Sequence, residues 1–332
     1  MTDVRSPALL CGRIVAVIAM GIVGAQLPGL AHAQQNFPSK PIRLVVPFTP
    51  GGTSDFLARA TIGKLSESWG QPVVIETRTG AGGTIGAAIV AKATPDGYTL
   101  LISSAAFTIS AALQPNLPYN ALKDFSGITR LGFSTTALIA PPALGVKTTK
   151  DLIALAQEKP GQIIFSSAGF GSSTHLNGER FRLAAGITVK HVGYRGASDA
   201  MIEVMAGRAQ YAIVSLSSSL SSIKDGRLVA LAVGTPERSS LLPDVPTIAE
   251  ALPGYARDGS HSLLAPAGTP SPILMKISKE VRRILELPDI KERLHNFDFV
   301  SAPTTPEEHD RILRADIATF TKVVRDAGLR PK

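Results

Sequence analysis

The chain has 332 residues, of which 44% are hydrophobic and 18% are charged, and its formal net charge is +8. This composition excludes a disordered or fibrous protein and fits one to three domains. The single cysteine, Cys11, excludes a disulfide framework and a cysteine-based metal site. No apolar run reaches about 18 uninterrupted residues, which argues against a membrane-spanning helix.

The first 33 residues have the pattern of a secretory signal peptide. Arg5 and Arg13 precede an apolar stretch at 14–23, and Ala31-His32-Ala33 forms a small-residue cleavage pattern. We predict cleavage after Ala33 and export to the periplasm, with a short membrane anchor as the alternative. Export and the 5% content of aromatic residues argue against nucleic acid as the partner of the positive charge.

Short runs of β-branched residues, bounded by turn residues, predict the strands. These runs lie at 42–48, 73–77, 98–104, 137–140, 163–167, 189–194, 211–215 and 228–234. Several are apolar at successive positions, as in strands that are buried on both faces. Because helical patterns lie between them, we predict an α/β protein with parallel sheets.

The helical patterns have recognisable faces and starts. Leu57, Thr61 and Leu65 share one face of a predicted helix, and Thr149 can cap another. The run Thr305-Pro306-Glu307-Glu308 predicts a capping box, with proline at the first helical position. An amphipathic helix is expected to follow it.

Glycine-rich turns follow four of the predicted strands, at 47–55, 77–84, 166–173 and 194–196. In the first turn we expect Thr53 or Ser54 to cap the next helix, so that its free amides point at the turn. Helix N-termini favour anions, and open α/β sheets bind ligands at the carboxyl ends of their strands. Each turn alone could be only a tight connection, but together they predict a site for a small anion such as a carboxylate.

Short motifs run in order through the chain from residue 37 to residue 330. They read VPFTPGGTSD, TRTGAGGTIGA, AKATPDGYTL, LPYNALKDF, SSAGFGSSTHL, VGYRGASDA, LPDVPT and LLAPAGTP. They resemble the Bug family of periplasmic solute-binding proteins, the binding subunits of tripartite tricarboxylate transporters. The resemblance implies a two-lobe, type II-like periplasmic binding protein with two hinge-crossing strands and a ligand cleft between the lobes. It also implies capture of a small carboxylate, which could be a dicarboxylate, a tricarboxylate or an aromatic acid, and its delivery to membrane permease subunits.

The resemblance also suggests where the lobes divide. We expect the first lobe to hold residues 37–130 and 261–332, and the second to hold 131–260. The crossing strands are expected at 137–140 and 263–265. We expect a monomer whose lobes close on the ligand.

Transferred onto this sequence, the family's site gives a set of predicted ligand-binding residues. The first lobe would contribute Thr49, Pro50, Gly51, Gly52, Thr53, Asp55, Arg78, Gly80, Ala81, Gly82, Gly83, Ser103 and Ser104. The second lobe would contribute Ser167, Gly169, Gly171, Ser172, His175, Tyr194 and Arg195. Capping or packing is an equal alternative for His175, and a plain surface charge is one for Arg195.

Some positions depart from the family's pattern. Where many members have an aspartate after a strand of the second lobe, this chain has Val214 and then Ser215. The missing carboxylate predicts a ligand without an amino group. Ser260, followed by His261, stands where a tryptophan is common, which predicts a wider mouth of the cleft.

Enzymatic readings find little support. The sequence contains no G-x-S-x-G elbow of the kind that a secreted serine hydrolase needs. It also offers no persuasive aspartate that would orient His175. No H-x-x-x-H pair indicates a metal site. We therefore predict no catalytic residue, cofactor or metal. A sensor that docks to a receptor kinase remains the alternative to a transport receptor.

Overall fold

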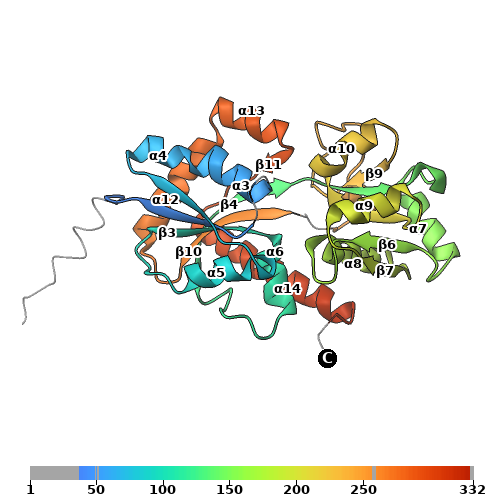
Figure 1. The fold of residues 1–332 in the computed structure, drawn as a ribbon, viewed down its shortest axis with the longest axis horizontal. Coiled ribbons are helices and arrows are strands. Elements are labelled where there is room, and N and C mark those ends of the chain that lie inside the picture. Colours follow the sequence, from blue (N-terminus) through green and yellow to red (C-terminus); the bar gives the residue numbers. More distant parts are fainter. Residues whose placement is uncertain (1–36, 49, 51, 256–258, 330–332) are drawn as a thin grey trace, which may run out of the picture. The chain divides into compact units, whose positions relative to one another are not determined.

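The computed structural model describes residues 37–48, 50, 52–255 and 259–329. The predicted signal peptide lies outside these residues. Residues 38–332 form one compact unit that contains two β-sheets (Figure 1). No helix within the described ranges is long and apolar enough to cross a bilayer.

The first sheet has six strands in the order β11-β4-β10-β3-β1-β2. The strands are β1 (Ile42–Val46), β2 (Val73–Thr77), β3 (Thr99–Ser104), β4 (Phe125–Ser134), β10 (Ser260–Pro266) and β11 (Phe299–Ser301). β1 pairs in parallel with β2 and β3, whereas β10 runs antiparallel to β3 and β4, and β11 antiparallel to β4.

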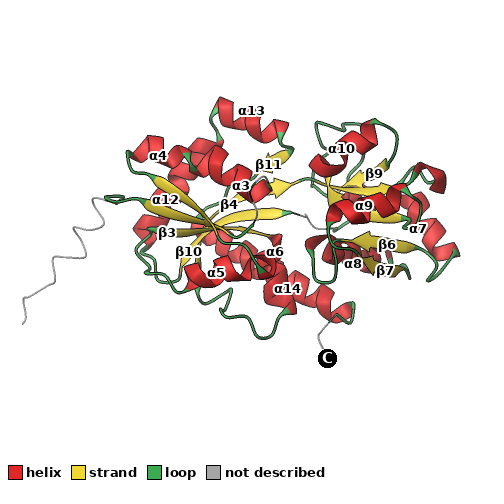
Figure 2. Ribbon diagram, viewed as in Figure 1, coloured by secondary structure: helices red, strands yellow, loops and turns green. Residues whose placement is uncertain are grey.

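Helices cover both faces of this sheet. They are α3 (Thr53–Leu57), α4 (Lys64–Trp69), α5 (Thr84–Ala91), α6 (Ala105–Leu113), α12 (Ser271–Leu285), α13 (Pro288–Asn296) and α14 (Pro306–Asp326). Figure 2 shows α4 and α13 on one side of the strands and α5, α6 and α14 on the other. Phe107 of α6 stacks on Tyr119 and meets Phe125 edge-on, with ring centroids 5.6 and 5.0 Å apart. This aromatic cluster fixes α6 against the sheet.

The second sheet has five strands in the order β7-β6-β8-β5-β9. The strands are β5 (Thr136–Ala140), β6 (Ile164–Ser167), β7 (Lys190–Gly193), β8 (Tyr211–Ser215) and β9 (Val229–Val233). Its helices are α7 (Thr149–Glu158), α8 (Ser173–Ala185), α9 (Ala197–Met205), α10 (Leu216–Lys224) and α11 (Ile248–Ala251). β5 is antiparallel to β8 and β9, and β6 is parallel to β7 and β8.

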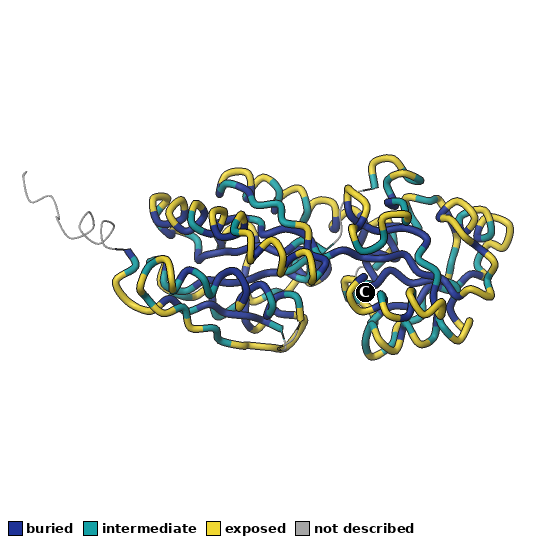
Figure 3. The backbone as a smooth tube through the Cα atoms, turned by 90° about the horizontal axis from the view of Figure 1, so that it is seen from above, coloured by how far each residue is buried: buried dark blue, intermediate teal, exposed yellow. Residues whose placement is uncertain are grey.

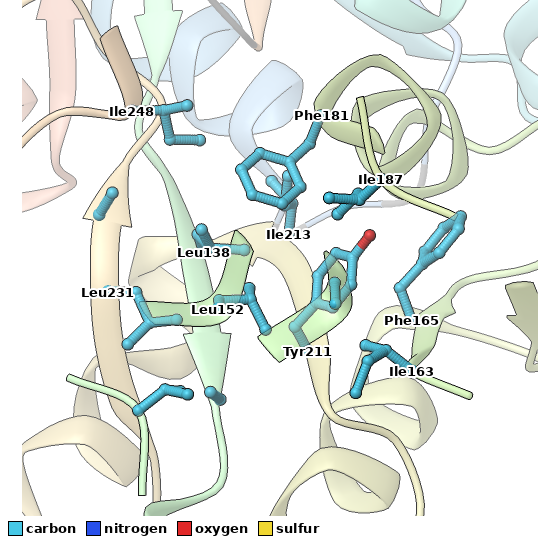
Figure 4. Packing of buried hydrophobic residues seen from close by; sticks show 14 residues of the cluster. Leu138, Leu152, Ile163, Phe165, Phe181, Ile187, Tyr211, Ile213, Leu231 and Ile248 are labelled. Atoms are coloured by element: carbon cyan, nitrogen blue, oxygen red, sulfur yellow. The ribbon is translucent and has the colours of Figure 1, made fainter. Parts of the chain in front are cut away.

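The strands of both sheets are largely buried, and the outer faces of the helices are exposed (Figure 3). In the second sheet the core gathers around Tyr211, which stacks on Phe165 and meets Phe181 edge-on (Figure 4). Leu138 and Leu231 complete this core from β5 and β9. The continuous apolar runs of these strands are thus explained by burial on both faces.

All the predicted strands are present, with ends that agree within two residues, but the expectation of parallel sheets was wrong. Both sheets are mixed, because β10 and β11 in the first sheet and β5 in the second run opposite to the other strands of their sheet. β4 and β11 were not predicted. β4 is interrupted by glycines that its neighbours require: a Cβ at Gly127 would overlap the His309 ring of α14, and one at Gly132 would overlap the Val300 carbonyl of β11.

The helix starts follow the predictions in part. Thr305 forms the expected capping box with Glu308. The cap of α7 is Thr148, not Thr149. The cap of α3 is the backbone of Gly52, so neither Thr53 nor Ser54 is the cap. The predicted single helix that follows is interrupted by a π-helical turn at Ala58–Ile62.

The chain passes between the two sheets at Thr135, and again in the segment that precedes β10. The predicted crossing strands at 137–140 and 263–265 each lie within one sheet, directly after a passage. The carbonyl of Asp298, which precedes β11, accepts hydrogen bonds from the amide and the hydroxyl of Thr135, at 3.3 and 3.2 Å. Asp298 Oδ1 accepts a third from Ser239 Oγ, after β9, at 2.9 Å. Asp298 therefore joins segments of both sheets.

Candidate functional site

A cavity of about 330 Å³, here called the front cavity, lies at the carboxyl ends of β1, β3 and β8. It has walls from both sheets. Its lining residues are Phe48, Gly52, Thr53, Ser54, Ser104, Ala105, Ala106, Ser134, Thr136, Ser173, Thr174, Asn177, Ala197, Ile213, Val214, Ser215, Gly259 and His261.

Helix N-termini converge on the front cavity. Ser104 and Ser215 are the N-cap residues of α6 and α10, and Ser173 and Ala197 are the first residues of α8 and α9. The first-turn amides of a helix have no acceptor within the helix, and the helix dipole adds positive potential there. The cavity therefore offers main-chain donors to an anion from both sheets.

The side chains of the lining are mostly hydroxyls and small apolar groups. None of the residues that line the front cavity is Lys, Arg, Asp or Glu, and His261 is its one imidazole. Burial lowers the pKa of His261 to about 4, although its Nδ1 donates a hydrogen bond to the Gly259 carbonyl at 2.9 Å. The ring is therefore neutral near pH 7, and the cavity carries no full charge.

Of the residues predicted from the first loop and the third strand, Gly52, Thr53 and Ser104 line the front cavity. Thr49 and Gly51 lie outside the described residues, and Pro50 is exposed. Asp55 is buried but does not line the cavity, and its Oδ1 lies 2.9 Å from Arg59 Nε. The structure thus gives Asp55 an ion pair within its own helical segment.

The predicted residues of the second loop lie beside the front cavity. Gly82, Gly83 and Ser103 line a separate space of about 10 Å³, which shares Phe48 and Ser104 with the front cavity. A space of this size holds about one water molecule. Gly80 and Ala81 are exposed, and the half-exposed Arg78 pairs with Glu76. The structure therefore places the second loop behind Phe48 and outside the front cavity.

The predicted residues at 167–172 support the start of α8 and do not line the front cavity. Ser172 Oγ donates to the Gly169 carbonyl at 2.7 Å and accepts from the amide of His175 at 3.2 Å. The amide of Gly171 donates to His175 Nδ1 at 3.0 Å. Ser167 Oγ lies 2.6 Å from His191 Nε2. This loop orients the helix that brings Ser173 and Thr174 to the cavity.

His175 itself is 1% exposed and lies outside the cavity lining. Its ring stacks on His191 with centroids 3.9 Å apart, and it also packs against Phe165 and Phe170. Burial, and then the neighbouring His191, lower the pKa of His175 to about 4. Of the two roles considered for His175, the structure supports packing.

Tyr194 and Arg195 line a surface depression away from the front cavity. The Tyr194 hydroxyl donates to Glu203 Oε2 at 3.4 Å, and Arg208 pairs with the same carboxylate. Tyr194 and Arg195 therefore lie beside the acidic side chains of Asp199 and Glu203. This position gives no support to a contact between Arg195 and a ligand carboxylate.

The sequence prediction missed most of the lining from the second sheet and from the chain passages. Ser134, Thr136 and Gly259 flank the two passages, which no local pattern marks. Val214 and His261 do line the front cavity, so the departures from the family's pattern had pointed to lining residues. No group of three His, Cys, Asp or Glu that could hold a metal ion occurs among the residues the structure describes.

The chain matches the family described as tripartite tricarboxylate transporter family receptor over residues 57–329. BugT of Bordetella pertussis is 32% identical over 323 residues, which cover 96% of this chain and 99% of BugT. The solved structure of R. palustris Rpa4515 with adipate is 32% identical, with a TM-score of 0.74, over 88% of this chain and 98% of that one. MatC from Rhodopseudomonas palustris with bound malate is 29% identical, with a TM-score of 0.70, over 87% of this chain and 100% of that one.

These matches span nearly the whole described chain and confirm the two-lobe periplasmic binding-protein fold and the resemblance seen in the sequence. The chain belongs to the tripartite tricarboxylate transporter receptors, a family of periplasmic solute-binding receptors and not of enzymes.

Proposed function

We propose that this receptor captures a small carboxylate in the front cavity and delivers it to the membrane permease subunits of a tripartite tricarboxylate transporter. The observation that carries the proposal is the convergence of helix N-termini on a cavity whose lining has no charged side chain. Amide and hydroxyl donors from both sheets can share the negative charge of a carboxylate.

The size of the cavity and the relatives support the same class of ligand. A volume of about 330 Å³ lies at the small end of the range of small-molecule sites. Adipate and malate, which the solved structures of the relatives contain, are both dicarboxylates. We infer that this chain also takes a dicarboxylate, since donors from both sheets suit an acid with a charge at each end.

Val214 adds a restriction on the ligand. It stands in the wall of the front cavity, at the position where we had expected the loss of an aspartate to matter. An ammonium group would find no carboxylate among the lining residues to pair with. We therefore infer that the ligand has no amino group, and tight binding of glutamate or aspartate would contradict this.

The remaining parts of the proposal concern the whole receptor. We infer that residues 37–130 and 261–332 form one lobe and 131–260 the other, and that the lobes close on the ligand as a monomer. We also infer that residues 1–33 act as a signal peptide that is removed after Ala33. N-terminal sequencing of the protein purified from periplasm tests the cleavage, and the mass of the purified protein in solution tests the monomer.

Binding is tested with residues 34–332 after any co-purified ligand has been removed by unfolding and refolding. Titration calorimetry and thermal shift are measured with adipate, malate, citrate, benzoate and glutamate. A ligand at a hundredfold excess over its Kd stabilises the native state by about 2.7 kcal/mol. We expect a clear shift with at least one acid and none with glutamate.

Ser215 provides a matched pair of variants. Ser215 is the N-cap residue of α10, and its side chain makes no capping hydrogen bond. Ser, Asn and Asp are equally favoured at this position, so we expect both S215D and S215N to leave the start of α10 in place. S215D adds a negative charge to the cavity wall. At about 5 Å and an effective dielectric constant of about 20, it would repel a carboxylate by about 3 kcal/mol, or about a hundredfold in affinity. We expect S215N to retain affinity within about threefold. Equal losses in both variants, or no acid that binds the wild type, would contradict the proposal.

A further inference from the structure

Asn177 is a buried polar residue in the wall of the front cavity. It belongs to α8 and has 5% of its surface exposed. Ser173 precedes it by four residues, so the two lie on one face of the helix, and both line the cavity. Side chains of a helix lean towards its N-terminus, and α8 begins at the cavity. The side chain of Asn177 therefore leans towards the space where we place the ligand.

The carboxamide of Asn177 makes no hydrogen bond to any residue in the described part of the chain, whereas its main-chain carbonyl accepts one from the Tyr255 hydroxyl at 3.4 Å. Most buried side-chain polar groups have a partner, because leaving a buried donor or acceptor unpaired is costly. Asparagine is also a less favourable residue in a helix interior. Neither the helix nor its packing explains an asparagine at this position, whereas a ligand contact does.

The residues on either side of Asn177 hold it in place. Leu176 is fully buried in an apolar cluster with residues of α6 and α14. Gly178 lies so close to β6 that a Cβ there would come within 2.3 Å of the Phe165 ring. Because both neighbours are packed in this way, α8 cannot turn about its axis, and it presents the carboxamide from a rigid element.

The carboxamide adds an acceptor to a cavity whose helix N-termini provide only donors. Its Nδ2 has two N–H donors, and its Oδ1 is an acceptor in the same plane. A carboxylate with a hydroxyl on the adjacent carbon presents an acceptor and a donor side by side, so it matches this pair with two hydrogen bonds. Asparagine pairs in the same two-bonded way with the donor and acceptor of an adenine edge. A plain carboxylate, which only accepts, would leave Oδ1 unpaired.

From this arrangement we propose that Asn177 determines specificity and makes the receptor prefer a dicarboxylate with a hydroxyl on the carbon next to one carboxylate. Nδ2 donates to an oxygen of that carboxylate, and Oδ1 accepts from the hydroxyl. An ammonium group in place of the hydroxyl would find no carboxylate among the lining residues. This inference rests on the proposed function, in which the front cavity receives a dicarboxylate.

The test compares acids that differ only at this carbon, by calorimetry on ligand-free residues 34–332. Malate, succinate and aspartate share one skeleton and carry a hydroxyl, a hydrogen and an ammonium group there. The glutarate and adipate series repeat the comparison with longer skeletons, and both enantiomers of each hydroxy acid are measured. In at least one series we expect the hydroxy acid to bind at least about tenfold more tightly than the plain acid, and the amino acid to bind most weakly.

The outcomes separate this inference from the proposed function. Equal affinities of the hydroxy and plain acids in every series would overturn the inference and leave the proposed function intact. Tighter binding of the amino acid than of the hydroxy acid would also overturn it. If none of these acids binds, the proposed function fails and the inference fails with it.

Leucine at two positions of α8 gives the matched variants. Leucine has the branched shape of asparagine without its donors and acceptor, and Ala184 is an exposed residue of the same helix outside the lining. We expect N177L to bring the affinities of the hydroxy acid and the plain acid within about threefold of each other, and A184L to keep the preference of the wild type. If N177L keeps the preference, another group of the wall recognises the hydroxyl and the inference is overturned.

Urea unfolding of the ligand-free variants separates this role from a structural one. N177L removes a buried polar group that has no partner in the described part of the chain, so we expect it to unfold at the same urea concentration as the wild type or at a higher one. A lower unfolding midpoint, together with an equal loss of affinity for all the acids, would assign Asn177 to the fold and overturn the inference.

Discussion

Two buried histidines make the stability of this receptor depend on pH. Burial lowers the pKa values of His175 and His261 to about 4, whereas an unfolded chain has a histidine pKa near 6.5. Between these values the unfolded state binds more protons, so stability is full above about pH 6.5 and falls as the pH decreases towards 4. Each histidine accounts for about 2 kcal/mol of this loss at pH 5.

This is tested by urea unfolding of the ligand-free protein at pH 7.5 and pH 5. We expect H261Q to reduce the difference in unfolding free energy between the two pH values by about 2 kcal/mol. The exposed His295 supplies the control, and H295Q should leave the difference as in the wild type. An unchanged difference in H261Q would show that His261 is not held neutral by burial.

The sequence could not decide the role of His175. Its spacing from Ser172 is compatible with a cap or a ligand contact, and Ser172 does accept a bond from its amide. The decisive partner is the ring of His191, which comes from a different strand. Such a contact depends on the tertiary fold and has no local pattern.

Among the elements, α14 has the clearest sequence signal. Thr305 Oγ1 accepts from the amide of Glu308 at 3.2 Å, and Glu308 Oε2 accepts from the amide of Thr305 at 2.9 Å. We expect T305A to lower the unfolding free energy by about 1 kcal/mol and T305S to keep it within a few tenths, since Ser caps as well as Thr. Both are measured by urea unfolding. An equal loss in T305S would attribute the effect to the methyl group of Thr305.

The capping box of α14 was predictable, whereas the cap of α3, the direction of the strands, and the strands β4 and β11 were not. The cap of α7 was predicted one residue too late. β11 has only three residues, and its place at the edge of the first sheet depends on its pairing with β4. β4 itself contains Gly127 and Gly132, which break the apolar pattern because α14 and β11 approach its backbone closely. Whether these two strands form is therefore determined by the segments that pack against them.

At the scale of the whole molecule, Asp298 joins segments of the two sheets through its hydrogen bonds with Thr135 and Ser239. It has a φ of 53°, in the left-handed region. Burial raises the pKa of its carboxyl group, and the hydrogen bond from Ser239 opposes this shift. D298N keeps an acceptor for Ser239, tolerates this conformation and removes a poorly solvated charge. We expect D298N to match or exceed the wild type in unfolding free energy at pH 7.

D298A is the matched variant. It leaves the Ser239 hydroxyl without its acceptor, which costs about 1–3 kcal/mol, and adds about 1 kcal/mol of backbone strain. Urea unfolding of both variants at pH 7 separates the two effects. If D298N loses as much as D298A, the charge itself and not the hydrogen bond holds the two segments together.

The two-lobe architecture could be predicted from the ordered motifs, but only part of the site could. Of the residues named from the sequence, Gly52, Thr53 and Ser104 line the front cavity, because Ser104 ends β3 and the turn after β1 leads to Gly52 and Thr53. The second glycine-rich loop and the loop at 167–172 do not line the front cavity. Gly82 and Gly83 of the second loop line the small neighbouring space instead. Which residue of a glycine-rich turn faces a cavity depends on how segments from two sheets meet, and a single segment does not encode this.

The donor set of the front cavity has a consequence for how such a receptor evolves. Among point mutations only a change to proline removes a main-chain N–H donor, so the affinity of the helix N-termini for a carboxylate survives most exchanges of side chains. Ligand preference must then change through the walls, at positions such as Ile213, Val214 and His261. Selection can in this way alter the cargo of the receptor by few substitutions while the chemistry that holds the carboxylate is inherited unchanged.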